Sequence, residues 1–276
     1  MKTAEVTEWR GAVYSVVDDS VYGRRELSLN LFYPSSKSGL RPAVVLLHGG
    51  GWRSGNPSMP EPIAVELAAR GFIAATVEYR LSLEALYPAA VHDVKAAIRW
   101  LRANAGDLDL DAGKIAVMGF SAGGQLAALV AVTGNNPHFE GAGGNAGYPS
   151  AVQALIDVDG VVAFIHPDSK EGAMAAQWLG GTAGEIPGIW EEASALTHVN
   201  KHSPPTLFLG SQFPRFLAGH KEMMEKLRSA GIYCEAHYFD NTPHPFWLFH
   251  PWFEPTVDYA FQFLNKVFRQ GEEKRP

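Results

Sequence analysis

The sequence predicts an α/β protein whose central sheet is mostly parallel and carries helices on both faces. Short runs of continuously apolar residues, typical of strands buried on both sides, alternate with longer segments of helical periodicity. This alternation is typical of parallel strands joined by helices. The chain has 276 residues, of which 46% are hydrophobic, which is enough for one large core. We therefore expect a single domain over residues 1–276, with a small cap-like insertion around residues 161–203.

Each predicted element follows from its local pattern. Apolar alternation around residues 13–17 and 27–33, with a Tyr22-Gly23 turn between them, predicts two N-terminal strands. Continuous apolar runs predict the buried strands, at 43–48, 72–79, 114–120, 152–160, 205–210 and 233–239. A spacing of three to four residues between apolar positions predicts the helices, at 61–70, 92–105, 122–133, 220–231 and 255–270.

Composition excludes several classes of function. The net charge is −6 and the basic residues are scattered, so we expect no nucleic-acid partner. No apolar run is long enough to cross a bilayer, and the N-terminus lacks the apolar core of a signal peptide. We expect a soluble protein that does not bind membranes, cytoplasmic as it stands or secreted if a signal peptide has been removed. The pattern does not define an oligomeric state.

The sequence also gives no sign of a cofactor. It contains no HExxH motif, no paired cysteines and no glycine-rich phosphate loop, so we expect neither metal nor cofactor. The single cysteine, Cys234, excludes an internal disulfide and is expected to be a small buried residue. The C-terminal GEEKRP, residues 271–276, is expected to be a solvated tail.

The strongest chemical motif is Gly-Phe-Ser-Ala-Gly, residues 119–123. A buried strand is predicted to end at Phe120 and a helix to begin at Ala122. A serine at such a strand-to-helix turn is held above the sheet edge, close to the positive end of the helix dipole. Small neighbours permit the strained turn. Ser121 is therefore the candidate nucleophile.

A second motif, His-Gly-Gly-Gly-Trp at residues 48–52, follows the first parallel strand. Consecutive glycines expose backbone N–H groups that can stabilise an oxyanion. The expected donors are Gly50, Gly51 and Ala122, with Gly49 as the alternative to one of them. His48 is expected to tether this loop rather than to act as a base.

The candidate base is His244, in the segment Asp-Asn-Thr-Pro-His-Pro-Phe after the last predicted strand. An imidazole titrates near neutral pH, so it can take a proton from a serine and deliver it to a leaving group. The order serine before histidine is typical of the fold that carries the Gly-x-Ser-x-Gly turn.

Together these segments resemble a known family. HGGGW (48–52), VEYRLS (77–82), YPAAVHDVKAAIRWLRANA (87–105), KIAVMGFSAGGQLAAL (114–129), FEGAGGNAGYPSAVQALID (139–157) and TPHPFWLF (242–249) resemble the α/β-hydrolase branch of hormone-sensitive-lipase-like esterases and bacterial carbohydrate acetyl and feruloyl esterases. The resemblance covers most of residues 40–270. It implies the α/β-hydrolase fold, a serine nucleophile, an oxyanion loop and an ester substrate, and it is closer to the compact, sugar-ester-cleaving members than to lipases.

The acid of the catalytic triad departs from the family pattern. In this fold the acid usually follows the strand predicted at 205–210, but residues 211–219 contain no carboxylate and Gln212 stands near the expected position. We favour Asp159, at the carboxyl end of the preceding strand, where active sites of open α/β sheets gather. Asp157 is expected to share its face. The alternatives are Glu222, Asp240, or no acid at all, with a neutral group or a backbone carbonyl orienting His244.

The expected activity is that of a serine carboxylesterase acting on short acyl esters. The acyl group is expected to be acetyl, on plant polysaccharide or oligosaccharide, and to be carried as an acyl-enzyme on Ser121. Trp52 and Trp247 are the candidate substrate-binding residues, because flat aromatic rings stack on sugars; Trp178, Trp190 and Trp252 support the same idea. An arylformamidase or a peptidase is the alternative on the same fold, and a non-catalytic binding protein is the distant one.

We expect structural roles for three charged side chains. Asp93 is expected to cap or brace its helix, and Glu78 to anchor the loop that holds Arg80. Arg215 stands among Phe213, Pro214 and Phe216, where an exposed arginine would be unusual. It is expected to pair with a carboxylate; the alternative is that it binds an acid or a hydroxyl of the substrate.

Overall fold

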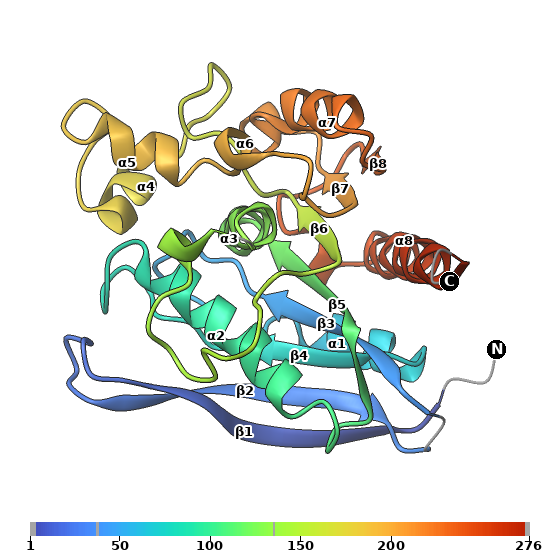
Figure 1. Cartoon of the computed structure of the whole chain (residues 1–276). Coiled ribbons are helices and arrows are strands. Elements are labelled where there is room, and N and C mark those ends of the chain that lie inside the picture. Colours follow the sequence, from blue (N-terminus) through green and yellow to red (C-terminus); the bar gives the residue numbers. More distant parts are fainter. Residues whose placement is uncertain (1–3, 37–38, 135, 274–276) are drawn as a thin grey trace.

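A computed structural model describes residues 4–36, 39–134 and 136–273 of the chain. Within these residues, eight strands form one sheet in the order β1-β2-β4-β3-β5-β6-β7-β8 (Figure 1). The strands from β4 through β8 in this order pair in parallel, whereas β2 is antiparallel to both of its neighbours. The strands are β1 (Val6–Val17), β2 (Arg25–Pro34), β3 (Arg41–Leu47), β4 (Ile73–Val77), β5 (Leu110–Phe120), β6 (Ala154–Val158), β7 (Thr206–Gly210) and β8 (Cys234–Tyr238).

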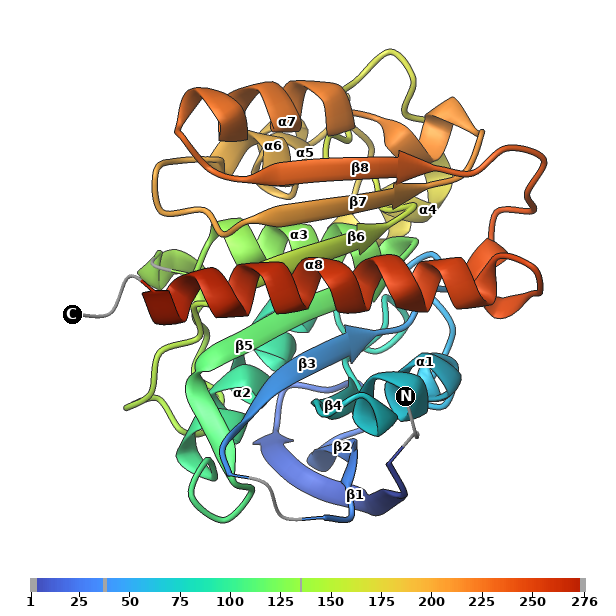
Figure 2. The same cartoon turned by 90° about the vertical axis from the view of Figure 1, so that its right-hand side faces the viewer.

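Helices cover both faces of the sheet. On one face α8 runs along the sheet beside α1, and α2 and α3 lie behind the sheet in the same view (Figure 2). The apolar side chains form one core cluster on each face, because the central strands are buried on both sides. The longer helices are α1 (Glu61–Ala69), α2 (Ala89–Ala103), α3 (Ala122–Val132), α7 (His220–Ser229) and α8 (Phe253–Glu273).

The predicted mostly parallel sheet with helices on both faces is confirmed, and the differences lie at element ends. β1 begins at Val6, well before the predicted residue 13, because its first half pairs with β2 although its side chains are largely exposed. A strand without a buried face lacks the apolar alternation that predicts strands. α2 begins at Ala89, three residues before the predicted start, directly after Pro88. Cys234 is buried in β8, as expected. Residues 274–276 of the expected solvated tail lie outside the described residues.

The segment 161–203 contains three short helices, α4 (Gly172–Leu179), α5 (Pro187–Glu192) and α6 (Ala195–His198). In Figure 1, α4 and α5 lie beyond the sheet on the side of α3. Their apolar residues form a third core cluster with Trp52 and Ala122, next to the predicted nucleophile. The segment is therefore packed onto the loops at the carboxyl ends of the strands.

A buried ion pair fixes the chain as it leaves β4. The guanidinium of Arg80 donates to both carboxylate oxygens of Asp93, with nitrogen-to-oxygen distances of 2.8–3.1 Å, and the Arg80 backbone N–H donates to the same carboxylate. The two side chains are 4% and 3% exposed. Asp93 thus braces the loop through Arg80. Glu78, two residues before Arg80, ties the start of this loop to β2 through a pair with Arg25 at 2.6 Å.

No helix among the described residues is long and apolar enough to span a membrane.

Substituting Asp93 by alanine should lower the free energy of unfolding by about 3–5 kcal/mol, because it leaves the buried Arg80 cation without its main partner. The matched control is Asp18→Ala, which removes a pair with Arg24 whose side chains are 80% and 76% exposed. That control should cost no more than about 1 kcal/mol. Urea unfolding followed by circular dichroism measures both. Equal effects of the two substitutions would show that the buried pair is not a major source of stability.

Candidate active site

Ser121 occupies a strained turn between β5 and α3. Its backbone has φ 55° and ψ −122°, a conformation that costs a non-glycine residue about 1–3 kcal/mol. The turn requires close backbone approach on both sides. A Cβ at Gly119 would lie 1.9 Å from the Gly123 carbonyl oxygen, and one at Gly123 would lie 2.4 Å from that of Leu47. Glycine is therefore required at both positions, and it is these contacts that raise the serine above the sheet edge.

His244 contacts Ser121 on one side and Asp159 on the other. Its Nε2 lies 2.8 Å from Ser121 Oγ, and its Nδ1 lies 2.9 Å from Asp159 Oδ2. Because a carboxylate can only accept, Nδ1 carries the imidazole proton and Nε2 is free to accept from the serine hydroxyl. The structure thus brings together the three residues that the sequence proposed as nucleophile, base and acid.

Asp159 comes from the end of β6, one strand before the usual place. Its side chain is fully buried, and its other oxygen, Oδ1, accepts from the backbone N–H of Ser211 at 2.6 Å. The backbone of Asp159 has φ 53°. This left-handed conformation turns its side chain out of the strand alternation, toward the loop that carries His244.

The expectation that Asp157 shares the face of Asp159 is wrong, because β6 ends at Val158 and the alternation ends with it. Asp157 Oδ1 instead accepts from the backbone N–H of Gly160 at 2.7 Å. Burial raises the pKa of Asp157 well above its ordinary value. Asp157 therefore supports the turn that carries Asp159, from beneath it.

The other candidates for the acid lie elsewhere. Glu222 contacts His166 at 3.5 Å, and Asp240 is exposed to solvent. Gln212, which stands where the family pattern expects the acid, accepts from the backbone N–H of Asn241 at 2.8 Å and donates to the carbonyl of Thr242 at 3.3 Å. Gln212 therefore tethers the loop that carries His244 instead of contacting the imidazole.

Two aromatic rings fix the plane of His244. Phe216 stacks on its face, with ring centroids 3.5 Å apart and planes 12° apart. Trp247 meets it edge-on at 5.4 Å. No local sequence pattern marks Phe216 as part of the site, because the stacking joins two segments that are far apart in the chain.

The glycine loop after β3 lies against the nucleophile. A Cβ at Gly49 would lie 3.1 Å from Ser121 Cβ, so loop and serine are in close contact. Within the described residues, the backbone N–H groups of Gly50, Gly51 and Ala122 donate to no protein group, and they are free to bind a substrate oxygen. His48 is buried and stacks on Tyr79, and its Nδ1 lies 2.8 Å from the Gly49 carbonyl oxygen. It thus tethers the loop, as expected, and burial lowers its pKa.

The expected sugar-stacking role of Trp52 and Trp247 is wrong. Their side chains are 2% and 5% exposed, so neither offers a ring face to a sugar. The Trp52 indole donates to Gln125 at 2.9 Å and stacks on Trp178 at 5.3 Å. Trp247 packs between Phe120 and His244. Both residues pack within the core beside the candidate catalytic groups, and Trp178 and Trp190 are buried as well.

The hollow at Ser121 is small. It measures about 10 Å³, far below the 300–1,000 Å³ typical of pockets for drug-sized ligands. The residues that line it are Trp52, Ser121, Ala122, Asp159, Val161, Glu171 and Phe216. Met174 lies beside it, since a Cβ at Gly51 would come within 2.5 Å of Met174 Cε. Among the described residues, no group of His, Cys, Asp or Glu side chains is arranged to hold a metal ion.

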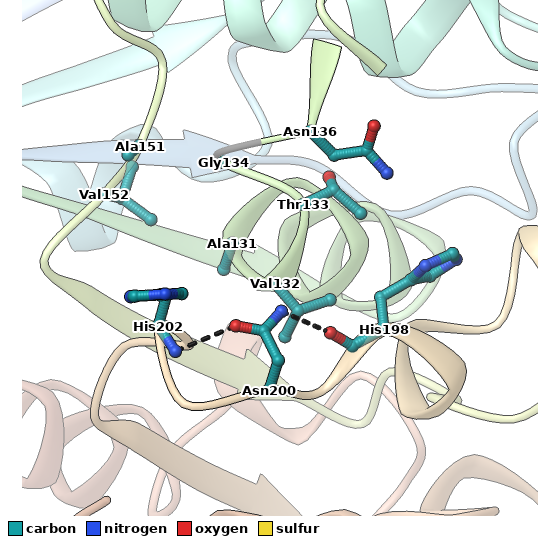
Figure 3. A pocket seen from close by; sticks show the side chains of 10 residues that line it. All are labelled: Ala131, Val132, Thr133, Gly134, Asn136, Ala151, Val152, His198, Asn200 and His202. Atoms are coloured by element: carbon teal, nitrogen blue, oxygen red, sulfur yellow. Dashed lines mark hydrogen bonds between the residues drawn. The ribbon is translucent and has the colours of Figure 1, made fainter. Parts of the chain in front are cut away.

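Figure 3 shows a second pocket, of about 230 Å³, at the carboxyl end of α3. It contains the imidazoles of His198 and His202, and the Asn200 side chain bonds to the backbone of both residues. Its described lining includes neither a serine nor a carboxylate. Because α3 has 11 residues, this pocket lies about 16 Å from Ser121 along the helix. Of these two pockets, the one at Ser121 is lined by a serine and carboxylates, and the described lining of the other contains neither.

Known esterases are similar to this chain in sequence. LipC, an esterase of Mycobacterium tuberculosis, is 30% identical over 174 residues, which are 61% of this chain and 43% of LipC. The carboxylesterase NlhH of the same organism is 37% identical over 110 residues, 40% of this chain and 34% of NlhH. The chain thus spans less than half the length of these two curated relatives.

Solved structures show the same fold. Esterase 2 of Thermogutta terrifontis, in a propionate-bound structure, is 27% identical, with a TM-score of 0.75 over 96% of this chain and 94% of its own. The same esterase is also known phosphonylated by sarin. A truncated carbohydrate esterase from gut microbiota has a TM-score of 0.77 over 96% of this chain and 98% of its own, at 24% identity.

These neighbours identify the fold as that of the α/β-hydrolases. The family model named BD-FAE matches residues 29–213, more than half of the chain. The chain therefore belongs to the BD-FAE family.

Proposed function

We propose that this protein is a serine carboxylesterase that cleaves short acyl esters, above all acetyl esters, through an acyl-enzyme on Ser121. The observation that carries the proposal is the chain of contacts from Ser121 Oγ to His244 Nε2 at 2.8 Å and from His244 Nδ1 to Asp159 Oδ2 at 2.9 Å. Related proteins that are named esterases and carboxylesterases support it. So does the neighbour phosphonylated by sarin, because such a reaction requires an activated nucleophile.

In the proposed reaction, His244 Nε2 takes the proton of Ser121 as Oγ attacks the ester carbonyl carbon. The oxyanion that forms accepts from the N–H groups of Ala122 and of Gly50 or Gly51. His244 then protonates the oxygen of the leaving alcohol, and the acyl group stays on Ser121. A water molecule, deprotonated by the same imidazole, releases the acid. Asp159 holds the ring and stabilises its protonated form throughout.

The acyl side of the site is proposed to be short. The hollow at Ser121 is small, and Met174 of α4 packs against the oxyanion loop. We propose that residues 161–203 act as a small cap that sets this limit. The related Thermogutta esterase has been observed with propionate and with butyrate bound, which are short acyl products.

The alcohol side is proposed to be a carbohydrate, on plant polysaccharide or oligosaccharide. This part rests on the resemblance to carbohydrate esterases, since the tryptophans do not supply a stacking surface. Activity on acetylated xylan, pectin and feruloyl esters, compared with N-formylkynurenine, would separate it from the arylformamidase alternative. An esterase acting on carbohydrate should hydrolyse the first group and leave N-formylkynurenine intact.

Replacing Ser121 by alanine should lower kcat on p-nitrophenyl acetate by about 10³-fold or more, because only binding and the oxyanion donors remain. The thermal unfolding midpoint should not fall, because alanine fits the same turn and leaves the packing around it unchanged. Retention of most of the activity in a variant free of wild-type enzyme would show that Ser121 is not the nucleophile.

Replacing Asp159 by asparagine should reduce kcat by about 10⁴-fold, because an amide cannot stabilise the protonated imidazole and favours the wrong tautomer. Asp240→Asn, in the same loop as His244 but exposed, is the matched control and should be mild. Steady-state kinetics on p-nitrophenyl acetate compares them. A large loss in the control with a small one in Asp159→Asn would assign the acid to Asp240.

Acetyl and propionyl esters should be hydrolysed faster than octanoyl esters by about tenfold or more in kcat/KM, because a long chain does not fit the small hollow. Met174→Ala opens the space beside Gly51 and should narrow this difference. A series of p-nitrophenyl esters measures both. A wild-type preference for octanoate would instead indicate a lipase-like site.

A further inference from the structure

Glu171 is the one ionisable side chain of the hollow that the proposed reaction does not use. It directly precedes α4 and lines the hollow together with Ser121, Ala122 and Phe216. Its side chain is 9% exposed. Burying a carboxylate is costly unless its oxygens are hydrogen-bonded, so the partners of Glu171 matter.

Only half of this carboxylate is satisfied by the protein. Oε1 accepts from Arg215 Nη2 at 2.9 Å. Within the described residues, Oε2 has no hydrogen-bond partner. Oε2 is therefore an acceptor without a protein partner in the hollow at Ser121.

A chain of contacts places Glu171 on the His244 side of the hollow. Phe216 stacks on His244 at 3.5 Å, the Arg215 guanidinium lies 4.7 Å from the centre of the Phe216 ring, and Arg215 pairs with Glu171. Since His244 delivers its proton to the leaving alcohol, this is the side on which the alcohol departs. Glu171 is therefore placed to contact the alcohol part of the ester rather than its acyl part.

We propose that Glu171 Oε2 accepts a hydrogen bond from a free hydroxyl on the alcohol part of the ester and so selects esters of polyhydroxy alcohols. The inference rests on the proposed esterase function and adds the residue that determines alcohol specificity. Arg215 compensates the charge of Glu171, so the pair as a whole attracts neither an anionic nor a cationic alcohol strongly. A neutral hydroxyl is the donor that satisfies Oε2 without adding a charge to the site.

The test compares two acetates whose alcohols differ in free hydroxyls, glycerol 1-acetate and n-propyl acetate. The measured quantity is the ratio of their kcat/KM values, in wild type, E171L and R215L. In E171L the ratio should fall by about tenfold, because a hydrogen bond to a charged acceptor is lost only for the glycerol ester. In R215L, which keeps the acceptor, the ratio should stay close to that of wild type. Thermal unfolding followed by circular dichroism checks that both variants fold.

The outcomes separate the inference from the function on which it rests. An unchanged ratio in E171L would overturn hydroxyl recognition by Glu171, and so would a fall in R215L equal to that in E171L. Neither result would contradict the proposed esterase function. The latter result would mean that the ion pair acts only by holding Phe216 against His244. If wild type hydrolysed neither acetate, the proposed function would fail, and this inference with it.

Discussion

At Ser121 the backbone is held in a conformation that a non-glycine residue avoids, and three segments must pack tightly to hold it there. Gly119 meets Gly123 across the turn, Gly123 meets the carbonyl oxygens of Leu47 and His48, and Gly49 meets the serine itself. Because each contact leaves no room for a Cβ, the strand ends of β3 and β5 and the start of α3 are fixed relative to one another. The proposed nucleophile and the proposed oxyanion loop are thus positioned by one set of backbone contacts. A small displacement of either would disturb both.

The position of the acid follows from the neighbouring pair of strands. β6 and β7 are adjacent and parallel, and beyond their paired residues the Asp159 N–H still donates to the Leu209 carbonyl at 2.9 Å. From the end of β6, the Asp159 carboxylate reaches His244, with 2.9 Å between Oδ2 and Nδ1. The proposed acid, Asp159, follows β6, and the residues after β7 make other contacts. The Ser211 backbone N–H donates to Asp159, Gln212 tethers the loop that carries His244, and Phe216 stacks on His244. The loop after β7 contains no carboxylate, but its residues still orient His244.

The sequence predicted the parts of the molecule that depend on local pattern. Buried strands and the turn around Ser121 have signatures within ten residues, because burial on both faces and close backbone approach restrict residue types locally. Asp159 could be proposed because active sites gather at the carboxyl ends of parallel strands. The partners Glu171 and Phe216 could not, since their contacts with Arg215 and His244 join segments whose relative placement the sequence pattern does not encode. Trp52 and Trp247 were misjudged for the related reason that aromatic residues have the same pattern in a core as on a binding surface.

The buried tryptophans help to hold the candidate active site in one conformation. Trp52 follows the oxyanion glycines directly, and its ring stacks on Trp178 of α4, while Phe164 packs against both. The segment 161–203 is therefore held to the oxyanion loop by a continuous aromatic cluster, and separating them would expose several large rings to water. Exposure of that much apolar area would cost several kcal/mol, so a packed cap is favoured over one that opens widely. Fixed in this way, the segment 161–203 keeps Met174 and Glu171 at constant distances from Ser121. The proposed selectivity then depends on a preformed hollow, which the aromatic residues keep rigid.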